Sequence, residues 1–243
     1  MRFLVPYHLD EPRPELDAPL TADAVLTVDL PETEDRWARM AVVYESVAAR
    51  VAESARRGER PVVVSGDCTT SLGTVAGLQR AGLDPAVVWF DAHGDLQTLE
   101  TTTSGYLGGL PLRMLVGYGR SLVADRIGLR DVPESRVVLT DARDLDPAEV
   151  DYLKTAEIRR RPVTDLGELP DGPIYLHIDF DVIDPEELPG LMVPAPGGPG
   201  LRSVTEAVGR VLDTGRVAAV GLACTWHDGV GAAERVRSAV ELL

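Results

Sequence analysis

The chain has 243 residues, of which 44% are hydrophobic and 26% charged, and its formal net charge at pH 7 is −15. This length and composition suit a folded domain with a large core, and the acidic balance argues against nucleic acid and anionic membranes as partners. No apolar run approaches the ~20 residues of a membrane span, and the start lacks a signal-peptide pattern. The cysteines, Cys68 and Cys224, are too few for a disulfide framework and favour a reducing compartment. We therefore expect a cytoplasmic protein.

Short β-branched and apolar runs alternate with stretches of helical periodicity along the chain. The runs predicted as strands are residues 3–7, 61–65, 86–91, 136–140, 174–179 and 217–222. Helices are predicted over residues 35–57, with Gly58 as a stop, and over residues 71–80. Residues 194–200, rich in proline and glycine, are predicted to form a long loop.

The predicted strands are apolar on both faces and are separated by helices. This combination indicates an α/β fold with a parallel sheet that is covered on both sides. The sequence contains no internal repeat and no convincing linker. We therefore expect one domain over residues 1–243.

Two of the predicted strands end in clusters of potential metal ligands. One cluster is Asp91, His93 and Asp95, and the other is Asp179 with Asp181. At alternate positions of an extended chain such side chains point the same way, and neighbouring carboxylates repel unless a cation compensates them. A helix N-cap explains a single aspartate at a strand end, but it does not explain the whole set. Four carboxylates and an imidazole suit two hard or borderline divalent ions.

Four sequence blocks are similar to the signatures of the arginase/agmatinase (ureohydrolase) superfamily. They are residues 65–73, 87–98, 101–111 and 177–185, and they occur in the order of that family. The resemblance covers about residues 60–225. It implies a three-layer α/β/α sandwich with a mostly parallel sheet and two divalent metal ions, Mn²⁺ in our expectation.

The resemblance also implies a role for each ligand. Asp91 and Asp179 are expected to bridge the two metals. The other ligands are expected to be Cys68 and Asp95 at one metal, and His93 and Asp181 at the other. A metal-bridging hydroxide then attacks an amidino carbon, and Asp95, which with His93 is an expected catalytic residue, passes the proton to the leaving group.

Further blocks point to substrate binding. Gln97 and Ser104 match positions that contact an α-carboxylate in arginases. At the position of Gln97, arginases have asparagine. Asp146 matches a residue that binds an α-ammonium group. Equally, Asp146 followed by Pro147 and Glu149 has the pattern of a helix N-cap with an acid in the first turn, so both readings of Asp146 stay open.

The sequence departs from the family pattern at three positions. Cys68 replaces a histidine ligand, and it is either a thiolate ligand or a packed side chain. Gly108 replaces a histidine that assists proton transfer, and Trp226 falls where the family has a guanidinium-binding glutamate. The first two departures resemble the N-omega-hydroxy-arginine hydrolase subgroup, whereas the third does not.

We therefore expect a binuclear metal hydrolase that cleaves a linear C–N bond of a guanidino or hydroxyguanidino compound. The alternatives are a hydrolase of an amidino or amide compound that lacks a cationic head, with Trp226 packed on it, and a degenerate metal-binding member. The expected partner is a small molecule, an amino acid with a guanidino-like group. Family members often form homo-oligomers, which makes a homo-oligomer a further expectation.

Overall fold

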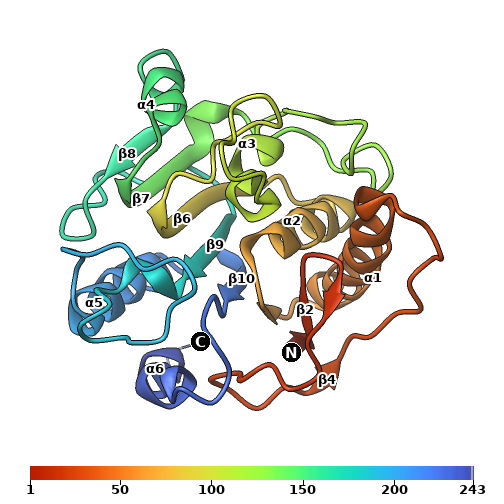
Figure 1. Cartoon of the computed structure of the whole chain (residues 1–243), viewed down its shortest axis with the longest axis horizontal. Coiled ribbons are helices and arrows are strands. Elements are labelled where there is room, and N and C mark those ends of the chain that lie inside the picture. Colours follow the sequence, from red (N-terminus) through yellow and green to blue (C-terminus); the bar gives the residue numbers. More distant parts are fainter. Residues whose placement is uncertain (242) are drawn as a thin grey trace.

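A parallel sheet of eight strands forms the centre of the computed structural model, which describes residues 1–241 and 243 (Figure 1). Its strand order is β4-β1-β5-β10-β9-β6-β7-β8, and every neighbouring pair is parallel. The strands are β1 (Arg2–Val5), β4 (Ala24–Val25), β5 (Val62–Ser65), β6 (Ala86–His93), β7 (Val137–Asp144), β8 (Arg159–Arg161), β9 (Ile174–Asp179) and β10 (Val217–Ala223). A separate antiparallel pair consists of β2 (Tyr7–His8) and β3 (Glu11–Pro12).

Helices cover both faces of the sheet, which confirms the predicted three-layer α/β/α sandwich (Figure 1). One face carries α1 (Arg36–Arg56), α2 (Ser71–Arg80) and α3 (Pro111–Leu115), and the other carries α5 (Leu201–Leu212) and α6 (Ala232–Val240). Helix α4 (Pro147–Leu153) follows β7. The 3₁₀ turns are η1 (Cys68–Thr70), η2 (Leu107–Gly109), η3 (Glu134–Arg136) and η4 (Phe180–Val182).

The central strands are buried on both faces because successive side chains point to opposite cores. In β6, Val87 and Trp89 pack into the core beneath α1 and α2, whereas Val88 and Phe90 pack into the core beneath α5 and α6. This alternation decides which strand-end side chains reach the cavity described below.

The chain supplies its helices with the expected start and stop signals. The Asp35 side chain accepts a hydrogen bond from the Ala38 backbone N–H at the start of α1, and Gly58 follows the helix with a positive φ of 75°. Residues 194–200 contain no helix or strand, as predicted. The Arg143 guanidinium holds this loop by donating to the Ala195 carbonyl at 2.7 Å.

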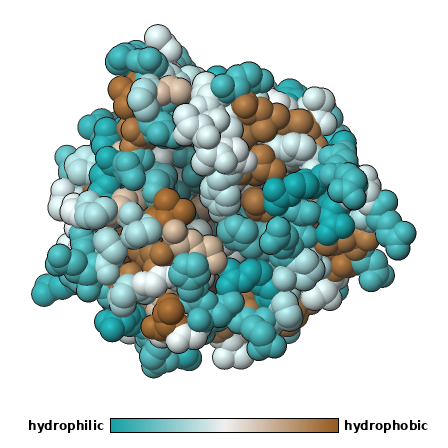
Figure 2. Space-filling view, viewed as in Figure 1, coloured by the Kyte–Doolittle hydropathy of each residue, from teal (hydrophilic) through white to brown (hydrophobic). Residues whose placement is uncertain are grey.

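Hydrophilic residues dominate the face shown in Figure 2, and its hydrophobic residues are scattered in small groups. Among the described residues, no helix combines the length and the apolar character needed to cross a bilayer.

Candidate metal centre and substrate pocket

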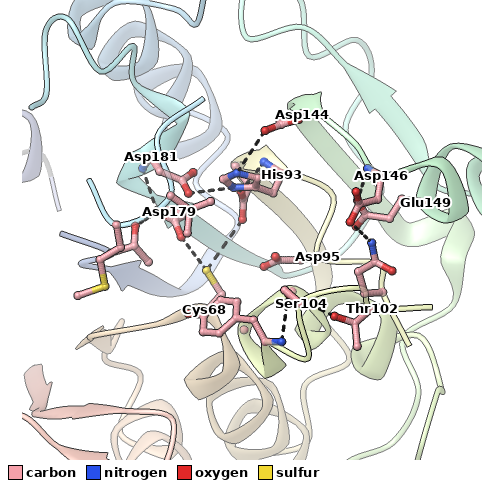
Figure 3. A pocket seen from close by; sticks show the side chains of 18 residues that line it. Cys68, His93, Asp95, Thr102, Ser104, Asp144, Asp146, Glu149, Asp179 and Asp181 are labelled. Atoms are coloured by element: carbon pink, nitrogen blue, oxygen red, sulfur yellow. Dashed lines mark hydrogen bonds and ion pairs between the residues drawn. The ribbon is translucent and has the colours of Figure 1, made fainter. Parts of the chain in front are cut away.

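A cavity of about 240 Å³ lies at the carboxyl edge of the sheet, where the loops after the parallel strands meet (Figure 3). It is lined by all of the site residues expected from the sequence except Trp226: Cys68, Asp91, His93, Asp95, Gln97, Ser104, Asp146, Asp179 and Asp181. The cavity has room for a small molecule of amino-acid size.

Two neighbouring strands bring the ligand clusters together. Trp89 of β6 is paired with His177 of β9, and so the next side chains on the same face, Asp91 and Asp179, lie at the same edge. Each aspartate also shapes its own turn. Asp91 Oδ1 accepts from the His93 backbone N–H at 2.7 Å, and Asp179 Oδ1 accepts from the Asp181 N–H at 2.9 Å.

One metal position is outlined by Asp91, His93 and Asp181, whose ligand atoms lie within 4.8 Å of one another. His93 Nδ1 is 3.0 Å from Asp181 Oδ2 and 3.4 Å from Asp91 Oδ1. We call this group the second position, and the group described in the next paragraph the first position. Asp91, His93 and Asp181 would hold an ion here through oxygen and imidazole ligands, a set that suits Mn²⁺ or Zn²⁺.

The other position is outlined by Cys68, Asp91 and His177, again within 4.8 Å of one another, and we call it the first position. Cys68 lies in η1, where its Sγ is 2.9 Å from Asp179 Oδ2 and 3.9 Å from Asp91 Oδ2. His177 was not among the ligands predicted from the sequence. Its signal was its place two residues before Asp179, on the same face of the strand.

The buried carboxylates of the site repel one another, and a cation would compensate their charge. Burial, followed by the charge of Asp181, raises the pKa of Asp179 to about 7, and burial with the charge of Asp91 raises that of Asp181 to about 6. Burial and the neighbouring aspartates also raise the pKa of Asp95. Burial alone would lower the pKa of His93, but Asp181 and Asp91 raise it to about 12. Divalent cations would compensate the buried carboxylates, and so the donor set fits a metal pair.

Comparisons with known proteins identify the family of the chain. A sequence model of the arginase family matches residues 8–224. The chain belongs to the arginase family. It is 33% identical to an arginase of Bacillus subtilis (strain 168) over 187 residues, which cover 70% of this chain and 63% of the relative. It is 34% identical to an N(omega)-hydroxy-L-arginine amidinohydrolase of Streptomyces lavendulae over 171 residues, 65% of this chain and 60% of the relative. In both alignments the chain spans less than two thirds of the relative's length.

Solved structures share the fold of this arginase-family chain. The native arginase from Bacillus caldovelox superimposes with a TM-score of 0.82 at 23% identity, covering 98% of this chain and 95% of that one. A formimidoylglutamase from Bacillus subtilis superimposes with a TM-score of 0.67 at 15% identity, covering 98% and 84%. The fold therefore does not by itself fix the substrate.

In the loop after β6, Asp95 of this chain combines an uncommon backbone conformation with an unpartnered carboxyl oxygen. Asp95 has a positive φ of 53°, and its buried Oδ2 has no hydrogen-bond partner. The next backbone N–H, that of Leu96, donates to Glu149 Oε1 at 2.9 Å. The chain thus turns the Asp95 carboxyl into the cavity and leaves one of its oxygens free.

The opposite wall contains the expected substrate-binding residues. Gln97 Nε2 donates to Asp146 Oδ2 at 2.6 Å, and Ser104 lies nearby in the wall (Figure 3). Asp146 is also the N-cap residue of α4, with its backbone N–H donating to Glu149 Oε2 at 3.0 Å. Both readings of Asp146 are therefore compatible with the structure, since the cap leaves its carboxylate beside Gln97.

The position of Gly108 is filled by a neighbouring side chain. A β-carbon on Gly108 would collide with the Tyr106 ring, which forms part of the cavity wall. The Tyr106 hydroxyl lies 3.2 Å from His8 Nε2, and the two rings stack with their centroids 5.8 Å apart. Tyr106 and His8 were not singled out from the sequence.

The structure corrects the expectation for Trp226. Its side chain is fully buried in the core beneath α5 and α6, 5.3 Å from Phe180 between ring centroids, and its indole N–H donates to the Asp17 carbonyl at 3.1 Å. Thr225 faces the cavity instead, and its Oγ1 lies 2.5 Å from Asp179 Oδ1. The reason is strand alternation: residue 225 continues the face of Ala223, whereas residue 226 continues the face of Cys224.

Proposed function

We propose that this protein is a metal-dependent amidinohydrolase that cleaves a linear C–N bond of a guanidino or hydroxyguanidino amino acid. The observation that carries the proposal is the convergence of the ligand set on one cavity: Asp91, His93, Asp95, Asp179 and Asp181. Two divalent ions, Mn²⁺ in this proposal, would lower the pKa of water to give a nucleophile near neutral pH. A degenerate protein would have no chemical reason to keep this set in one wall.

The residues around the reacting carbon divide the remaining work. Asp95 has a free buried oxygen in the cavity wall, which allows it to accept the proton of the attacking water. It then donates that proton to the departing nitrogen, so that an amine leaves and the carbonyl product remains. Thr225 donates a hydrogen bond to Asp179 and fixes the orientation of that carboxylate.

The far wall is suited to the backbone end of an amino acid. The Asp146 carboxylate would attract an α-ammonium group, while the Ser104 hydroxyl and the Gln97 amide would bind the α-carboxylate. The cavity volume of about 240 Å³ is consistent with one amino acid and bound water.

Within this class we favour a hydroxyguanidine over plain arginine. Tyr106 takes the space beside Gly108 and puts a phenol group into the wall, where it offers a partner for a polar substituent on the guanidino nitrogen. The similarity to the Streptomyces lavendulae amidinohydrolase supports the same choice. Hydrolysis of Nω-hydroxy-L-arginine would release hydroxyurea and ornithine. An amidino or amide compound without a cationic head is the second candidate, because the uncharged Thr225 faces the cavity after β10, where the sequence comparison expected a guanidinium-binding acid.

The test is a screen of purified, Mn²⁺-loaded protein against L-arginine, Nω-hydroxy-L-arginine, agmatine and guanidino acids, with urea and hydroxyurea as readouts. Elemental analysis in the same experiment should find about two ions per chain. Asp179→Ala should lose both ions and all activity, whereas Asp184→Asn, outside the cavity wall, should keep them. Two ions retained by Asp179→Ala would refute the ligand assignment, and wild-type protein that binds metal but releases neither product from any compound would refute the substrate class.

A further inference from the structure

His177 occupies a buried site directly behind the candidate metal centre. It lies on β9, is only 2% exposed, and stacks on Trp89 with the ring centroids 3.7 Å apart. The Trp89 indole N–H in turn donates to Asp91 Oδ2 at 3.1 Å. His177 is therefore held rigidly beneath the aspartate that both metal positions share.

Only one nitrogen of the His177 ring has a hydrogen-bond partner. Nδ1 lies 3.0 Å from Ser71 Oγ and 3.3 Å from the Tyr175 hydroxyl oxygen, and these two hydroxyls are 2.7 Å apart. Nε2 is buried and has no partner. An unpartnered polar atom in a core is costly and needs a physical explanation.

The missing partner of Nε2 is consistent with a metal ion. When Nδ1–H donates to a hydroxyl oxygen, Nε2 carries the lone pair, and this arrangement is typical of a histidine ligand. A ring nitrogen of His177, Cys68 Sγ and a carboxylate oxygen of Asp91 lie within 4.8 Å of one another. Donor atoms around a tetrahedral ion are about 3.3–3.8 Å apart, so small side-chain movements bring this group to bonding distance.

We infer that His177 is a metal ligand, and that it forms the first position together with Cys68 and Asp91. The inference deepens the proposed function and rests on it. It makes the two positions chemically unequal. Thiolate and imidazole ligands give the first position a preference for Zn²⁺ or Co²⁺ over Mn²⁺, whereas His93 and Asp181 leave the second position richer in oxygen.

The direct experiment is X-ray absorption at the zinc edge on the full-length His93→Ala variant loaded with one equivalent of Zn²⁺. The chain has four histidines, and with His93 removed, His177 is the histidine of the Cys68 and Asp91 group. The expected spectrum shows one sulfur and one imidazole in the same coordination shell. A sulfur ligand without imidazole scattering would overturn the inference.

A second measurement compares Zn²⁺ and Mn²⁺ affinities of metal-free wild type, His177→Ser and the control His227→Ser by calorimetry. His227 is exposed and does not line the cavity. Loss of an imidazole ligand should weaken Zn²⁺ binding at the first position by ~100-fold or more, with little change in Mn²⁺ binding at the second position. The control should match wild type at both.

The outcomes separate the two proposals. Two ions bound with unchanged affinity in His177→Ser would refute the role of His177 and leave the proposed hydrolase intact. Wild-type protein that binds no ion at either position would refute both.

Discussion

The metal-free protein should lose stability as the pH rises from about 4 to about 7, the reverse of the usual trend for acidic groups. The cause is the raised pKa of two buried carboxyls, about 7 for Asp179 and about 6 for Asp181, against 3.8 for an ordinary aspartate. Between these values the folded chain binds more protons than the unfolded chain. The contribution of these two carboxyls to stability is therefore fully present below the unfolded pKa and is lost as the pH rises through the folded one.

The size of the effect follows from the Asp179 pKa. One pKa unit corresponds to about 1.4 kcal/mol, so ionisation of Asp179 alone costs on the order of 4 kcal/mol by the time it is complete. His93 does not cancel this loss below pH 6.5. Its pKa of about 12 lies above the ordinary 6.5, so its stabilisation is fully present below pH 6.5 and is lost only as the pH rises towards 12.

The assay is urea unfolding of chelator-treated wild type and Asp179→Asn between pH 4.5 and 7.5. Asparagine imitates the protonated aspartate, so the variant should resemble wild type at low pH and exceed its stability by a few kcal/mol near pH 7. Bound Mn²⁺ or Zn²⁺ should remove the loss in wild type, since an ion at 100 times its Kd adds ~2.7 kcal/mol. A stability difference between the two proteins that does not change with pH would refute the reasoning.

Substitutions at Cys68, Trp226 and Gly108 test three separate features of the site. Cys68→His should raise Mn²⁺ affinity and Cys68→Ser should weaken the first position more than the second, as followed by calorimetry, whereas no change in either variant would mean that Cys68 only packs. Trp226→Phe should lower the free energy of unfolding by ~1–3 kcal/mol, through the lost hydrogen bond to Asp17 and the lost packing, with metal content unchanged; loss of metal would contradict its placement. Gly108→Ala should reduce turnover at least tenfold by displacing the Tyr106 ring, and Gly108→Ala combined with Tyr106→Ala should recover part of the loss, a recovery that double-mutant kinetics would detect.

The sheet and the convergence of most candidate metal ligands on one cavity were predictable because both depend on short-range patterns. Apolar runs such as residues 86–91 and 174–179 predict buried strands without any information on the segments between them. In the structure these runs form β6 and β9. Side chains on the same face at the carboxyl ends of neighbouring strands then meet at one edge, as Asp91 and Asp179 do. Neither inference needs knowledge of the loops.

The errors and omissions arose where side-chain direction or distant packing decides the outcome. The alignment placed Trp226 in the pocket, but alternation from Ala223 directs Thr225 there and turns Trp226 into the opposite core. His177 looked like an ordinary strand residue, because its relation to Cys68 depends on how η1 packs on the sheet. The contact between Tyr106 and His8 joins residues far apart in the sequence, which no local pattern reveals.

Glu149 links the loop after β6 to the start of α4. Its Oε1 accepts from the Leu96 N–H and its Oε2 from the Asp146 N–H, so one carboxylate joins the turn that carries Asp95 to the cap that carries Asp146. The side chain is only 4% exposed, and burial raises its pKa while the two backbone N–H groups favour its charged form. The positive φ of Asp95 is unfavourable for a residue with a side chain, and the hydrogen bond from the next residue to Glu149 contributes to holding this turn. The acid that looked from the sequence like a simple helix-start residue thus ties Asp95 to Asp146, and in the proposed function this link sets the distance between the proton-transfer group and the amino-acid end of the substrate.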